Sequence, residues 1–208
     1  PLLEGNEEEE LVKEQKAKRL EGEFIHFPTD RPLPDFWLKN LSFSATLPVG
    51  EVAVLVKDIT HQQDVINKAT TLSANGKDLK NIKALSLNGV LDHRSGQGTD
   101  TFDLDIQQWR LKGLNLGLAG LELDHSDLNL QGDVVFTGAN MKAEGKGQFS
   151  QATFQSSDRT VLAKEMLSAL SSIDQFNVNA KAKGALSGPD ISLSSDLDSK
   201  LSRAFNKR

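Results

Sequence analysis

From residue 36 onward, apolar and polar residues alternate along the chain with a period of two. The clearest runs are Leu85, Leu87 and Leu91, then Phe102, Leu104 and Ile106, then Leu128 and Leu130, and then Val134 and Phe136. Such alternation is typical of antiparallel strands that bury one face and expose the other. The sequence therefore predicts a sheet with a single apolar face. A second sheet, a helix or an apolar ligand could each cover that face.

Glycine, proline and asparagine divide the alternating region into segments, as turn and bulge residues do. The pattern predicts strands at 36–47, 51–59, 69–76, 82–93, 99–111, 113–118, 120–125, 127–138, 140–149, 151–156, 175–184 and 189–195. Their spacing favours a meander of antiparallel strands. The predicted fold class is therefore mainly β, a strongly twisted antiparallel sheet of groove-like or sandwich-like form, with two or three short helices at its ends.

Three regions follow from this pattern. Residues 1–35 are predicted to form a solvated helix, at 7–21, and a proline-rich connector. Residues 36–198 form the β domain, which includes an amphipathic helix at 158–173. Residues 199–208 form a helical tail.

Two aspartates precede the predicted helices of the C-terminal half. Asp158 is expected to be the N-cap of the helix at 158–173, and Asp196 the cap of the final helix. The stripe Leu162, Met166 and Leu170 indicates that the first of these helices packs over one end of the sheet.

The composition favours some classes of partner and chemistry and argues against others. Aromatic residues make up 6% of the chain and tyrosine is absent, so the apolar face is mostly aliphatic, which suits packing and would also suit acyl chains. The net charge of −5 argues against a nucleic-acid partner, because phosphate binding needs clustered cations. The chain has no cysteine, which excludes disulfides and thiolate chemistry. No cofactor is predicted.

Two groups of polar residues are candidates for chemistry. The repeated Leu-Asp-His at His93 and His125 could bring two imidazoles to a metal, but a site needs three or four ligands and no third is evident. Asp100, Asp103 and Asp105 could pair for glycoside chemistry or hold calcium, yet a solvated polar face explains them better. No nucleophile motif with supporting context occurs, and the protein is predicted not to be an enzyme.

Trp37 and Trp109 leave a further alternative open. They could stack on a sugar, which would suit a carbohydrate-binding module, but tryptophans in sheets more often fill an edge or the core.

The C-terminal strands resemble those of AsmA-like envelope proteins, and more narrowly an AsmA-related family of gammaproteobacteria. The resemblance rests on a strand, a Gly-x-x-x-Gly-Pro turn and a closing strand, here Gly184, Gly188, Pro189, Ile191, Leu193, Ser195, Asp196, Leu197 and Asp198. It implies a β region on the periplasmic face of the bacterial envelope, anchored to the inner membrane through a segment outside this chain. In larger relatives a hydrophobic groove carries phospholipid acyl chains. The family supplies no catalytic residues.

The leading hypothesis is a non-enzymatic lipid-handling or envelope-maintenance module. The residues expected to line its groove or core are Leu104, Ile106, Leu116, Leu118, Leu128, Leu130, Val134 and Phe136. The rival hypothesis is a structural or protein-interaction module with a closed, ligand-free core. Expected partners are phospholipid, another envelope protein, or a second copy that pairs through an open sheet edge. A ten-residue strand reaches only about 33 Å, so this chain would be one module of an envelope-spanning path.

Overall fold

A computed structural model describes residues 33–116 and 120–206, without the side chains of residues 204–206. The chain divides into two units, Pro1–Pro32 and Leu33–Arg208, and everything below concerns the second. The predicted helix at 7–21, most of the proline-rich connector and Leu118 lie outside the described residues.

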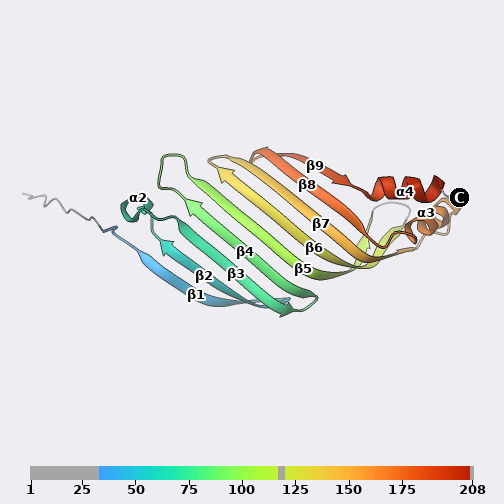
Figure 1. Cartoon of the computed structure of the whole chain (residues 1–208), viewed down its shortest axis with the longest axis horizontal. Helices are drawn as coiled ribbons and strands as arrows, with labels where there is room; N and C mark the ends of the chain where they lie inside the picture. Colours follow the sequence, from blue (N-terminus) through green and yellow to red (C-terminus); the bar gives the residue numbers. More distant parts are fainter. Residues whose placement is uncertain (1–32, 117–119, 207–208) are drawn as a thin grey trace, which may run out of the picture. The chain divides into compact units, whose positions relative to one another are not determined.

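One nine-stranded antiparallel sheet dominates the described residues, and its strands follow one another in sequence order (Figure 1). The strands are β1 (Leu38–Leu47), β2 (Gly50–Ile59), β3 (Thr70–Leu79), β4 (Ile82–Asp92), β5 (Thr99–Asn115), β6 (Leu121–Thr137), β7 (Asn140–Ser156), β8 (Phe176–Ala185) and β9 (Asp190–Ser195). The helices are α2 (Gln63–Ile66), α3 (Val161–Leu170) and α4 (Leu197–Asn206). The predicted mainly β, antiparallel fold is confirmed, and the sheet is open.

The prediction of two strands in each of the regions 99–118, 120–138 and 140–156 is wrong. Each region holds one strand, and β5, β6 and β7 are 17 residues long. At about 3.3 Å per residue they reach roughly 56 Å, well beyond the 33 Å expected from ten residues.

Backbone irregularities interrupt the apolar alternation within these long strands. Gln108 and Gln151 have positive φ angles of 47° and 52°, and the pairing register of β5 with β6 shifts between Ile106 and Trp109. A bulge inserts one residue, so the apolar alternation restarts out of phase while the strand continues. Ile106 and Trp109 accordingly pack into the same apolar cluster. Trp109 is half-buried and packs against the buried residues of this cluster, in line with its interpretation as an edge or core residue.

Two apolar clusters stabilise the sheet. The cluster at the helical end contains Leu121, Leu123, Ala152, Leu170, Ile173 and Phe176, with Leu197 and Leu201 of α4 packed against it. The second contains Val52, Ala74, Leu79, Ile82 and Ile106 on β2 to β5. Figure 1 shows α3 and α4 together at one end of the sheet, while the short α2 lies at the other end.

Helix α3 begins later than the predicted residue 158. Thr160 is its N-cap, since its hydroxyl accepts a hydrogen bond from the Ala163 N–H at 3.2 Å. The Asp158 carboxylate instead accepts from the Thr160 N–H at 3.0 Å and from its hydroxyl at 3.1 Å. Asp158 therefore orients the cap rather than being the cap.

The Asp196 carboxylate does not cap α4 either. It accepts hydrogen bonds from the Asn177 N–H at 2.7 Å and the Asn177 side-chain amide at 3.0 Å, and it pairs with Lys200 at 3.1 Å. The bond from the Asn177 N–H and the Lys200 ammonium lower the pKa of Asp196 below its usual value. The N-terminal N–H of α4, on Leu197, is bound by the Ser195 hydroxyl at 3.1 Å. Asp196 thus joins the start of α4 to β8.

Asp196→Asn is expected to lower the free energy of unfolding at neutral pH by about 1 kcal/mol, a value kept small because the side chain is partly exposed. Since the folded pKa lies below the ordinary 3.8, the stabilisation is complete above that value and is lost as pH falls through the lowered folded pKa. Urea titrations at pH 7 and about pH 3 should show a smaller acid destabilisation in D196N than in the parent. Asp190→Asn on β9 is the control, and an identical acid response in D196N and the parent would contradict this role.

Candidate functional site

The apolar face extends over the full width of the sheet. Cross-strand pairing aligns one residue from each strand into a continuous row: Phe43, Val54, Ala74, Leu87, Leu104, Gly132, Gly145, Ala180 and Leu193. The adjacent row is Leu41, Val56, Leu72, Gly89, Phe102, Val134, Ala143, Ala182 and Ile191. Directly paired residues in an antiparallel sheet point to the same side. These two apolar rows carry no polar side chain in any strand.

The middle of the face lies open over a pair of glycines. Gly132 and Gly145 are directly paired, and a methyl group placed on either would meet only backbone atoms, the closest being the Glu144 carbonyl at 3.5 Å. Elsewhere a side chain fills this space, as the Phe102 ring does over Gly89. At these two positions on β6 and β7, therefore, the backbone itself forms the surface of the apolar face, and no side chain covers it.

Large apolar side chains stand exposed at both margins of the rows. Ile191 and Leu193 on β9 are 75% and 72% exposed, and Phe43 on β1 is 48% exposed. On the described part of the chain, no second sheet packs against this face.

The predicted lining residues fall into three groups. Leu104, Leu130, Val134 and Phe136 are half-buried on the apolar face, and they lie on the neighbouring strands β5 and β6. Ile106 and Leu128 are buried. Leu116 lies apart from these and packs against the cluster at the helical end.

The predicted lining residues did not include those that the other seven strands, β1 to β4 and β7 to β9, contribute to the face. The same period-two alternation marks them, at Leu41 and Phe43 and at Ile191 and Leu193. The glycine pair had no signal in the sequence, because only the register shows that the two residues are opposite each other.

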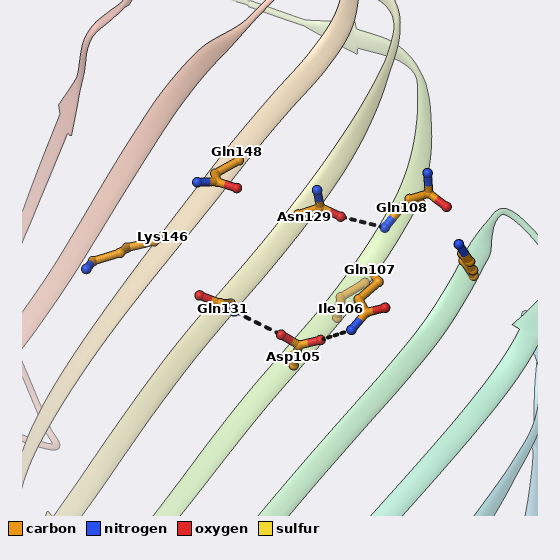
Figure 2. A pocket seen from close by; sticks show the side chains of 9 residues that line it. Asp105, Ile106, Gln107, Gln108, Asn129, Gln131, Lys146 and Gln148 are labelled. Carbon is orange, nitrogen blue, oxygen red and sulfur yellow. Dashed lines mark hydrogen bonds between the residues drawn. The ribbon is translucent and has the colours of Figure 1, made fainter.

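The opposite face is polar and holds a hollow of about 400 Å³ (Figure 2). The Asp105 carboxylate accepts hydrogen bonds there from the side-chain amides of Gln107 and Gln131, each at 3.1 Å. The Asn129 side-chain carbonyl accepts one from the Gln108 N–H at 2.8 Å, which stabilises the bulge. Asp105 therefore lies on the polar face as predicted, in an amide-rich surface that can hydrogen-bond water or a polar ligand.

A second hollow of about 350 Å³ adjoins the first and is more charged. Asp103 is directly paired with Asp133, which is in turn paired with Glu144. Lys142 at 3.2 Å and Lys181 at 3.4 Å bind the Glu144 carboxylate and lower its pKa. This face is thus mainly polar and charged in the region of the two hollows, in contrast to the two apolar rows.

The structure does not bring His93 and His125 together. The His93 ring lies 2.8 Å from the Asp100 carboxylate, whereas the His125 ring lies 2.7 Å from the Thr153 hydroxyl. Within residues 33–116 and 120–206, no group of three potential ligands could hold a metal ion.

Trp37 does not line either hollow. Its indole N–H donates to Asp58 at 3.0 Å, and the ammonium groups of Lys39 and Lys68 lie 4.7 and 5.6 Å from its ring. Two lysines of the chain itself therefore lie against the Trp37 ring, and neither tryptophan is among the residues that line the two hollows.

Comparisons with protein families, with curated proteins and with solved structures find no match to this chain. The resemblance to AsmA-like proteins accordingly stays a prediction. None of the described helices has the length and apolar character needed to cross a membrane.

Proposed function

We propose that this chain is a non-enzymatic lipid-handling module of the bacterial envelope, and that its apolar sheet face holds phospholipid acyl chains. The observation that carries the proposal is the pair of apolar rows, which run across nine strands with no sheet over them in the described residues. The resemblance to AsmA-like proteins supports a periplasmic location and an anchor in the inner membrane.

The dimensions of the face suit acyl chains. Nine strands about 4.8 Å apart give each row a length of about 38 Å, whereas one leaflet of a bilayer core is about 15 Å thick. Contiguous exposed apolar patches on soluble proteins mark sites that bind a protein, a membrane or an apolar ligand. Each 100 Å² removed from water by a bound chain would contribute about 2.5 kcal/mol.

The uncovered glycine pair supports a linear apolar ligand in particular. Gly132 and Gly145 allow a chain to approach the backbone, and Ala143, Ala180 and Ala182 continue the small side chains toward β9. The larger Leu104 and Phe102 on β5 flank these small residues on one side, and Ile191 and Leu193 on β9 flank them on the other. A methylene chain makes no hydrogen bonds, so a strip of small apolar residues between larger ones suits it.

The rival hypothesis requires these strands to bury one another. The described strands form a single sheet, so they do not bury their apolar face in a closed β-sandwich. An envelope protein that covers the face is the remaining competitor.

Native mass spectrometry with lipid extraction tests the proposal on protein purified from bacteria without detergent. The expected result is phospholipid at close to one molecule or more per chain. A lipid-free mass, together with an extract that contains no phospholipid, would overturn the proposal, and pull-downs for a protein partner would follow.

A further inference from the structure

The two edges of the sheet differ in how they are protected. At one edge, β9 has only six residues, follows Pro189 and is succeeded directly by α4. At the other edge, β1 has ten residues with the sequence LKNLSFSATL, whose only charge is Lys39 and which has no proline. Natural sheets block free edges with prolines, charges, bulges or short strands. Strand β1 has little of this protection, which indicates that another strand pairs with its edge.

The exposed surface of β1 is itself patterned for pairing. Leu41 and Phe43 are 39% and 48% exposed on the apolar side, while Ser42 and Ser44 are exposed on the polar side. Every second residue of an edge strand also directs its N–H and C=O groups away from the sheet, where they can bond another strand. Among the described residues, β2 is the only strand that pairs with β1.

We propose that β1 pairs with β1 of a second copy of this chain across a two-fold axis. The two strands are antiparallel, Ser42 lies on the axis opposite Ser42 of the second copy, and Leu41 lies opposite Phe43 of the second copy. This register overlaps residues 38–46 of both strands and keeps Pro48, which has no N–H, outside the ladder.

Several features of the sheet favour a second copy as the occupant. All eight strand pairings are antiparallel, and a two-fold axis through an edge strand produces that same orientation. On the apolar side the register places Leu41 opposite Phe43, and on the polar side it places Asn40 and Ser42 opposite serines. Toward the strand ends, Lys39 lies opposite Ala45 and Leu38 opposite Thr46. The two apolar rows would join those of the second copy and double in length.

Disulfide trapping tests the pairing, because the chain has no cysteine of its own. In the proposed register the two Cα atoms at position 42 are about 4.5 to 5.5 Å apart, within the range that a disulfide spans. Ser42→Cys is therefore expected to give a disulfide-linked dimer under mild oxidation. Ser192→Cys, exposed on the polar side of the other edge, is the matched control and should stay mostly monomeric.

A charge variant gives an independent readout. Ser42→Lys places two ammonium groups opposite each other on the axis, and like charges in directly opposed positions destabilise pairing. Sedimentation should show a dimer for the parent and for Ser192→Lys, and a monomer for Ser42→Lys, all with the same circular dichroism. A parent that is monomeric at high concentration, with no more cross-linking in S42C than in S192C, would overturn the proposal.

Discussion

Leu123→Ala is expected to lower the free energy of unfolding by about 3 kcal/mol, as truncation of a fully buried leucine does. Leu123 on β6 is 1% exposed and lies in the cluster that joins the sheet to α3 and α4. Truncation removes the transfer free energy of the lost methyl groups and leaves a cavity that α3 and α4 cannot close completely. This cluster attaches both helices to the sheet. Weakening it should therefore also reduce the helical circular dichroism signal before the sheet unfolds.

Urea denaturation followed by circular dichroism measures this effect. Leu114→Ala is the matched control, because Leu114 pairs directly with Leu123 on the neighbouring strand yet is 47% exposed. It should cost about 1 kcal/mol or less. Equal destabilisation by the two variants would show that the helical end is not a packed core.

The double variant Ile191→Glu, Leu193→Glu is expected to reduce co-purifying phospholipid by about tenfold or more. Both side chains are over 70% exposed, so the fold should tolerate the change. Two carboxylates at the margin of the apolar rows would have to lose water when an acyl chain lies against them, which costs more than the roughly 1.4 kcal/mol that corresponds to tenfold.

The control for this variant lies on the same strand. Ser192→Glu, Ser194→Glu places the same charges on the same edge but on the polar face, where the two serines pair with Lys181 and Asn179. Lipid content, measured by extraction and quantified per chain, should be unchanged in this control. Loss of lipid in both variants would mean that net charge, rather than the apolar face, governs binding.

The alternation of apolar and polar residues was sufficient to predict the face on which most residues lie. Leu104 and Asp105 show this, since neighbours in sequence lie on opposite faces as expected. The period of two is a local property of an extended backbone, so it needs no knowledge of distant residues.

The length of the strands could not be predicted in this way. Gln108 and Gln151 adopt positive φ angles although neither is glycine, and the bond from the Gln108 N–H to Asn129, 21 residues away, stabilises one of these bulges. The start of α3 was likewise shifted because Asp158 binds Thr160 instead of the helix N-terminus. At Gln108 and at the start of α3, a side-chain contact thus stabilises one of several local conformations that the sequence allowed.

The candidate site was predicted in part. Leu104, Leu130, Val134 and Phe136 lie together on the apolar face, but Leu116 belongs to the helical end. The glycine pair at 132 and 145 could be found only from the strand register. Glycine has no side chain and so no part in the apolar alternation, and whether two glycines form an open site depends on their being opposite each other.

Fluorescence quenching by brominated phospholipid tests whether the apolar rows hold acyl chains, because it shows which face of the sheet contacts them. Single cysteines at Leu193→Cys and Ser194→Cys place a bimane probe on the apolar and polar faces of the same strand, in a chain without other cysteines. With bromine on the acyl chains, we expect strong quenching of the probe at position 193 and little at position 194. Equal quenching at the two positions, or none at position 193, would show that acyl chains do not lie on the apolar face.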